Sequence, residues 1–146
     1  MKKFLSAGLA VLMLALCTVS AFASSMQITT HSEVDYQLSY PADVEIPWES
    51  PETVIGAITA EKMLIEPQKC VAVTVASAND YTLVNVTDAE KSIAYTLSGA
   101  DAMVFAPSEI GKSFPLAALV TEDAWAKAAA GEHKDVLTFT AEYKNQ

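Results

Sequence analysis

The sequence predicts an all-β fold, an antiparallel β-sandwich with one short helix before its last strand. Apolar side chains recur at every second residue in short runs, which is the period of strands with one buried face. Turn segments rich in Pro, Gly, Asn, Asp and Ser separate these runs. About nine short strands therefore follow one another at intervals of roughly 8–12 residues, as in sandwiches and barrels.

The clearest alternation lies in residues 34–40, where every even-numbered side chain is apolar or aromatic. Pro41 ends this strand because proline has no N–H to donate to a ladder. Residues 70–76 and 81–86 surround a Ser-Ala-Asn-Asp turn, and we expect them to form a hairpin. The remaining strands are expected in the following ranges: 43–48, 54–60 with a bulge at Gly56, 62–65, 93–97, 102–105, 114–120 and 135–143.

The single helix is expected directly after Thr121, with Glu122 and Asp123 in its first turn, followed by residues 124–130, which are rich in alanine, the strongest helix former. Thr121 is suited to cap its N-terminus, and Gly131 is suited to the left-handed conformation that ends a helix. On so short a helix we expect Trp125 to plug the open end of the β core. The alternative is that Trp125 stacks against a ligand.

Residues 1–23 have the three parts of a cleavable secretory signal peptide: a start with two lysines, an apolar stretch, and a final Ala-Phe-Ala. Cleavage is therefore expected before Ser24. The alternative is an uncleaved membrane anchor, because the apolar stretch is close to the ~20 residues that a spanning helix needs. We expect three parts in the chain: a signal peptide over 1–23, a flexible or strand-adding segment over 24–33, and a β-sandwich domain over 34–146.

The charge of the chain limits its partners. The formal net charge is −9, and removal of Lys2 and Lys3 with the signal peptide would bring it to −11. The chain contains no Arg, the residue best suited to bidentate contacts with phosphates and bases. We therefore expect no binding to nucleic acid and none to membranes after signal cleavage. The expected location is outside the cell or on its surface, or the periplasm where the host has an outer membrane.

No catalytic, cofactor or metal site is expected. After cleavage the histidines are His31 and His133, which are far apart in the sequence, and no serine lies in a Gly-x-Ser-x-Gly turn. Cys70 lies in a strand-like apolar run, where a buried thiol is expected. Neither a zinc spacing nor a calcium-loop spacing is present. The sequence therefore predicts a protein that is not an enzyme.

The C-terminal third resembles the closing segment of a known group of proteins. The residues that carry the resemblance are Asp123-Ala-Trp125, Ala128-Ala-Ala-Gly131, Asp135-Val-Leu-Thr-Phe-Thr140 and Tyr143, together with Tyr36-Gln-Leu-Ser-Tyr-Pro41 upstream. They resemble small secreted bacterial immunoglobulin-like sandwiches, such as spore-coat and fimbrial-type subunits. The resemblance implies an immunoglobulin-like fold and a surface or matrix component secreted by a bacterium. It implies no catalytic residues.

The expected function is that of a secreted, non-enzymatic structural or interaction domain, a surface, matrix or fimbria-like component that presents loops or an edge strand to a protein partner. The polar, Thr-rich residues 24–32 are either a strand that adds to a neighbouring subunit or a flexible tail. The alternative function is an extracellular module that binds carbohydrate or peptide through exposed aromatic side chains. The candidate ligand contacts are Trp48, Trp125, Tyr81 and Tyr95.

Overall fold

The structure, a computed structural model, describes residues 26–146. The expected signal peptide and its cleavage site lie outside these residues. The chain divides into a unit that ends at Ser32, of which residues 26–32 are described, and a compact unit, Glu33–Gln146. Residues 26–32 are exposed and have no regular secondary structure. Within the described range, no helix has the length and the apolar character needed to cross a membrane.

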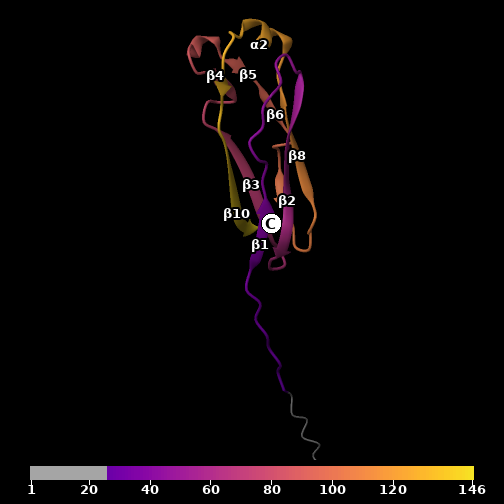
Figure 1. Cartoon of the computed structure of the whole chain (residues 1–146). Helices are drawn as coiled ribbons and strands as arrows, with labels where there is room; N and C mark the ends of the chain where they lie inside the picture. The colour runs from indigo at the N-terminus through magenta and orange to yellow at the C-terminus, as the bar shows by residue number, and fades with distance from the viewer. Residues whose placement is uncertain (1–25) are drawn as a thin grey trace, which may run out of the picture. The chain divides into compact units, whose positions relative to one another are not determined.

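Two antiparallel sheets form the body of the compact unit (Figure 1). The first sheet has the strand order β1 (Asp35–Ser39), β2 (Glu52–Leu64), β8 (Ser113–Leu119) and β6 (Thr96–Ser98). The second has the order β10 (Leu137–Asn145), β3 (Lys69–Ser77) and β7 (Met103–Phe105). The predicted all-β class is therefore confirmed.

A smaller set of elements lies together at one end of the two sheets (Figure 1). It consists of a short sheet in the order β5 (Ile93–Ala94), β4 (Thr82–Asn85) and β9 (His133–Lys134), the 3₁₀ helix η1 (Ala89–Lys91) and the α-helix α2 (Glu122–Lys127). A separate apolar cluster, formed by Ile93, Val120 and Trp125, lies beneath α2. This end closes the fold over the core.

The main core lies between the two sheets because alternate residues of each strand point inward. Ile58 of β2 and Leu116 of β8 face Val71 of β3 and Phe105 of β7, and all four are at most 1% exposed. Full burial of one such side chain contributes about 1.5–3 kcal/mol to stability. The alternation seen in the sequence thus provides the driving force that holds the sheets together.

Several predicted strands differ from the structure. Residues 54–60 and 62–65 belong to one strand, β2, and the predicted bulge at Gly56 is confirmed by a register shift in its pairing with β8. The predicted strand over 43–48 is wrong: these residues form an irregular segment, which Pro47 interrupts. The range 93–97 is divided into β5 and β6, with Tyr95 between them.

The predicted hairpin around residues 77–80 is also wrong. Strands β3 and β4 belong to different sheets and do not pair with each other. Asp80 and Tyr81 adopt positive φ angles of 49° and 56° at this corner. The Tyr81 amide donates to Ser77 Oγ at 2.7 Å, so a side chain replaces the pairing partner at this corner.

The helix begins where the sequence predicts and ends earlier. Thr121 Oγ1 accepts a hydrogen bond from the Ala124 amide at 3.2 Å, which confirms the predicted N-cap. The helix stops at Lys127, and Ala128 is already extended with ψ at 148°. Gly131 has a positive φ of 130° but lies beyond the helix. The high helix propensity of alanine is a weak preference, and the return of the chain toward β9 overrides it.

Candidate functional site

Strand β10 has one side without a partner strand. It pairs antiparallel with β3 along its whole length of nine residues, and the described part of the chain supplies no strand for its other side. The Val136 carbonyl accepts from the Ala78 amide at 2.9 Å, and the Gln146 amide donates to the Gln68 carbonyl at 3.0 Å. Backbone groups alternate in direction along a strand. The N–H and C=O groups of residues 137, 139, 141 and 143 therefore face the open side.

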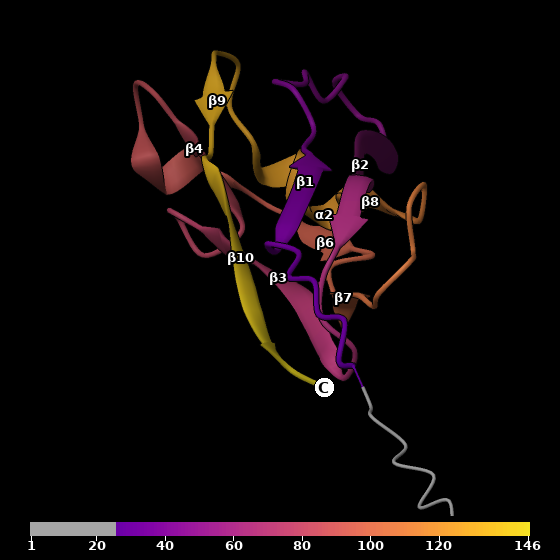
Figure 2. The ribbon, with the colours of Figure 1, turned by 90° about the horizontal axis from the view of Figure 1, so that it is seen from below.

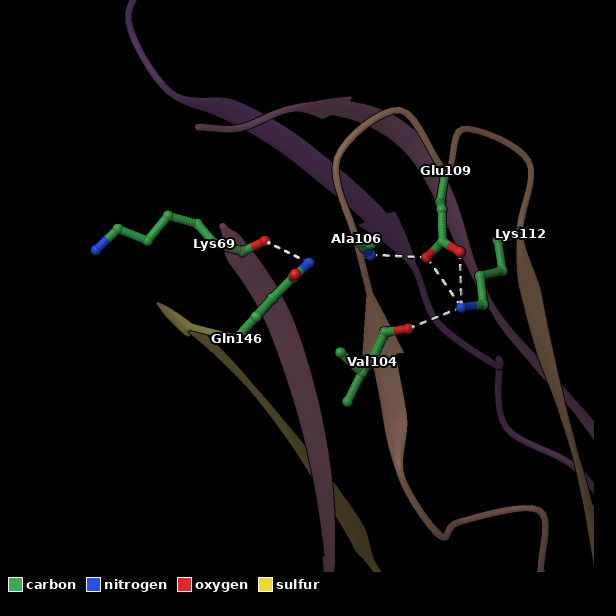
Figure 3. A network of polar contacts seen from close by, with 6 residues as sticks. All are labelled: Lys69, Val104, Ala106, Glu109, Lys112 and Gln146. Atoms are coloured by element: carbon green, nitrogen blue, oxygen red, sulfur yellow. Dashed lines mark hydrogen bonds and ion pairs between the residues drawn. The ribbon is translucent and has the colours of Figure 1, made fainter. Parts of the chain in front are cut away.

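Of the other edge strands, β6 and β7 are short, and β7 is partly covered. Strands β6 and β7 have three residues each. At β7 (Figure 3), Lys112 Nζ donates to the Val104 carbonyl at 3.0 Å and to both oxygens of Glu109. A hydrogen bond from the Ala106 amide, followed by the bond from Lys112, lowers the pKa of Glu109. A charged side chain on an edge is a common protection against strand addition. Strand β10 carries Glu142 and Lys144 near its C-terminal end, whereas residues 137–141 contain no charged side chain.

Strand β1 is the edge strand of the first sheet on the side where β10 lies (Figure 2). The rings of Tyr36 and Tyr143 lie 6.4 Å apart, and those of Tyr40 and Phe139 lie 5.8 Å apart. No backbone ladder joins the two strands in the described structure. Aromatic contacts therefore fill the space between the sheets beside Phe139 and Tyr143 of β10.

Beside the N-terminal half of β10 the space is open and forms a cleft of about 780 Å³. The segment 41–48 forms one wall and residues 131–139 form the other. The side chains Ile55, Ile93 and Ala118, which are at most 9% exposed, also line it and belong to the apolar core. The free edge of β10 thus borders a cleft that reaches the core. We call this arrangement the edge cleft.

The charged residues of the edge cleft are mainly acidic. Asp43, Glu45, Glu132 and Asp135 line it together with Lys134. Lys134 Nζ lies 2.9 Å from Glu132 Oε1, so this lysine is already paired. The cleft therefore combines apolar core side chains with a negatively charged surround.

Asp135 is fixed by hydrogen bonds at the entry to β10. Its carboxylate accepts from Tyr95 Oη and Ser77 Oγ, each at 2.7 Å, and from the Asn79 amide at 3.2 Å. Burial acts to raise the pKa of Asp135, but the hydrogen bonds from Tyr95, Ser77, the Val136 amide and Asn79 outweigh it, and the pKa is lowered. Burial, then the bond to Asp135, raises the pKa of Tyr95. The wall of the cleft is therefore held by a charge-assisted network.

The four aromatic candidates have different environments. Trp125 is 8% exposed and donates from Nε1 to the Ser50 carbonyl at 3.0 Å, as expected of a core plug. Tyr95 and Tyr81 form an edge-to-face pair at 5.8 Å, and the Tyr81 hydroxyl donates to the Val75 carbonyl at 3.3 Å. Trp48 is 54% exposed and packs 5.1 Å from Trp125. Trp48, Trp125 and Tyr95 all line the edge cleft, whereas Tyr81 does not.

The remaining residues considered for chemistry are apart from one another. His133 Nε2 lies 3.1 Å from Asn85 Nδ2 and from the Lys91 carbonyl, so this ring joins two loops. Cys70 is buried, with its Sγ 3.9 Å from the Asn145 carbonyl. Over residues 26–146, no group of three or more His, Cys, Asp and Glu side chains is placed to hold a metal ion.

Sequence reasoning missed the open edge of β10 and the role of Asp135. The free edge could not be predicted from the sequence, because an edge strand and a central strand show the same alternating pattern until their partner strands are known. A weaker signal was present: the last run is long and contains no proline to block pairing. For Asp135 the only signal was its position directly before that run.

Comparison with known proteins gives no relative: no family model, no curated protein and no solved structure matches the chain at a significant level.

Proposed function

We propose that this chain is a secreted, non-enzymatic structural or interaction domain of the immunoglobulin-like kind, a bacterial surface or matrix component that binds an extended polypeptide along β10. The observation that carries this proposal is the free edge of β10 beside the edge cleft. Long unprotected edges are templates for pairing with another chain, and native sheets normally cover them. An edge left open over apolar side chains is suited to binding.

An added strand would bind the β10 edge through its backbone and the edge cleft through its side chains. Its backbone would pair with the outward N–H and C=O groups of residues 137, 139 and 141, each hydrogen bond contributing about 0.5–1.5 kcal/mol. Every second side chain would enter the cleft toward Ile55 and Ala118. Backbone pairing supplies affinity, and the cleft supplies selectivity for apolar residues at alternate positions. This division is typical of recognition by strand addition.

A second function is favoured by one observation, the exposure of Trp48 at the edge cleft. Exposed indoles provide flat apolar platforms, and carboxylates such as Glu45 accept hydrogen bonds from hydroxyl groups. A carbohydrate-binding module would use this pair. Its test is a titration with soluble glycans that follows tryptophan fluorescence. A fluorescence change that disappears in Trp48→Ala would support carbohydrate binding. If no glycan changes the fluorescence, the carbohydrate-binding function is wrong.

The test of the main proposal uses a short synthetic peptide of alternating Val and Thr residues as the probe. Binding is followed through the backbone amide signals of the ¹⁵N-labelled protein. We expect shifts and slower amide exchange at residues 137, 139 and 141, because these N–H groups would gain partners. A peptide of the same sequence that is N-methylated on every amide is the matched control. It retains the side chains and loses the backbone donors on both edges, so it should not bind.

Two results would overturn the proposal. Shifts confined to the outer faces of the sheets would show that the peptide binds elsewhere. Equal binding of the methylated control would show that side chains alone, and not an added strand, account for the interaction.

A further inference from the structure

We infer that the polypeptide bound at the edge cleft is basic, and that it places an arginine or lysine side chain against Trp48, with the charged group beside Asp43 and Glu45. This inference rests on the proposed function, because it names the chemistry of the partner that the same site binds. The apolar lining of the cleft would contact the hydrocarbon stem of that side chain, and the acidic lining would contact its charged group.

Two carboxylates on one wall of the cleft are not neutralised by the chain itself. Asp43 and Glu45 lie in the segment 41–48, and both residues are exposed. Over the described part of the chain, neither forms an ion pair. A cationic group from another molecule would therefore meet two carboxylates that have no cationic partner.

The basic residues that line the cleft are already engaged. Lys134 Nζ lies 2.9 Å from Glu132 Oε1. The ring of His133 lies between two loops, with Nδ1 3.1 Å from the Gly131 carbonyl oxygen and Nε2 3.1 Å from the Lys91 carbonyl oxygen. Both side chains are thus held by groups other than the carboxylates of the opposite wall.

The acidic character continues beyond the edge cleft. A neighbouring hollow of about 470 Å³ shares the Trp125 side chain with the cleft. Glu49 and Glu122 line this hollow, and no basic residue lines it. A concave surface lined by one sign of charge raises the local concentration of oppositely charged ligands and the rate at which they associate. The charge of this region therefore favours a cationic partner.

Trp48 supplies a surface on which such a side chain can lie. Its ring is 54% exposed and lies 5.1 Å from the ring of Trp125. A cation over the face of an indole is attracted by the ring quadrupole, and the planar guanidinium of arginine also stacks on it. Val44 and Val136 line the same cleft and are exposed, so they offer apolar surface to the stem. A basic side chain uses both kinds of surface, whereas a purely apolar one leaves the carboxylates without a partner.

The first test compares peptides built on the alternating Val/Thr probe. One central Val is replaced by Arg, Lys, norleucine or Glu, and norleucine is the matched control because it has a similar apolar stem and no charge. Affinities are measured from the amide and indole N–H signals of the ¹⁵N-labelled protein. At low ionic strength the Arg and Lys peptides should bind about five- to tenfold more tightly than the norleucine peptide, and the Glu peptide should bind more weakly. Added salt should reduce these differences.

The second test removes the charges of the wall. In the double variant Asp43→Asn/Glu45→Gln, the advantage of the Arg peptide over the norleucine peptide should fall to about twofold or less. The norleucine peptide should bind this variant as it binds the unchanged chain. Glu33→Gln/Asp101→Asn is the matched control, because it removes the same charge at exposed residues that do not line the cleft. It should keep the full preference for Arg.

Each outcome decides one point. Equal binding of the Arg, norleucine and Glu peptides overturns the inference and leaves the proposed function standing, because strand addition does not depend on this charge. If the two double variants weaken the preference for Arg equally, the overall negative charge of the protein attracts the peptide, and the inference is also overturned. An Arg peptide that binds without shifting the Trp48 indole signal overturns the placement against Trp48. If no peptide binds, including the Val/Thr probe, the inference and the proposed function both fall.

Discussion

The hydroxyl of Tyr95 donates a 2.7 Å hydrogen bond to Asp135 Oδ2, which joins the bend between β5 and β6 to the entry of β10. Ser77 Oγ, at the end of β3, donates to the same carboxylate oxygen. Three segments that are far apart in the sequence are therefore fixed at one carboxylate. Because β10 starts two residues after Asp135, this point determines where the free edge lies relative to the cleft.

The first prediction concerns acid stability. The pKa of Asp135 is lowered in the folded protein, so its ionised form stabilises the fold above the ordinary aspartate pKa of about 4, and this contribution is lost as the pH falls through the lowered value. Asp135→Asn should therefore cost about 1–3 kcal/mol at neutral pH, and much less at pH values below the lowered pKa. Urea unfolding at both pH values measures the difference. Asp101→Asn, at an exposed carboxylate, is the control. An equal loss at both pH values would contradict the assignment.

The second prediction separates the two tryptophans. Trp125→Ala should lower the free energy of unfolding by about 3–5 kcal/mol because it empties a buried site. Trp125→Phe keeps most of the packing and loses the hydrogen bond to the Ser50 carbonyl, so it should cost less, about 1–2 kcal/mol. Trp48→Ala, at a half-exposed ring, should cost about 1 kcal/mol or less. A comparable loss for Trp48→Ala would show that Trp48 supports the fold.

The third prediction tests the direction of the β10 backbone. Thr140 pairs with Thr74, and its N–H faces β3. Thr140→Pro should therefore cost about 3 kcal/mol or more, because it removes a ladder hydrogen bond. Ala141→Pro removes an N–H on the open side and should cost far less, as expected for proline on a sheet edge. Thermal unfolding of the two variants measures this difference. Equal destabilisation would show that the outer side of β10 is not free.

The fourth prediction compares two glycines with similar backbone conformations. Gly99 has φ at 85° and Gly111 has φ at 83°. A Cβ at Gly99 would lie 2.1 Å from the Pro115 carbonyl oxygen, whereas a Cβ at Gly111 would meet nothing within 4 Å. Gly111→Ala should cost about 1–2 kcal/mol for the left-handed conformation alone. Gly99→Ala should cost about 1–3 kcal/mol more because the strand must shift. Chemical denaturation measures both, and equal costs would contradict the close contact at Pro115.

Several elements could be predicted because their signals are local. The alternation in residues 70–76 and 135–143 predicted strands that the structure shows as β3 and β10. The Thr121 cap and the bulge at Gly56 were also correct. The strand predicted over 43–48 was wrong because its apolar residues line the cleft and enter no ladder. Local pattern identifies an extended or apolar segment, but it does not show whether a partner strand is available.

The sequence by itself determined that strands dominate the regular structure of residues 26–146, since the period of two is a property of neighbouring residues. Only the tertiary structure decided that β3 and β4 separate, that β10 pairs on one side alone, and that Tyr95, Ser77 and Asp135 meet. The physical reason is that pairing joins residues such as Leu137 and Ser77 across long stretches of chain. Whether such a contact forms depends on packing and on competing partners, and no local pattern contains that information.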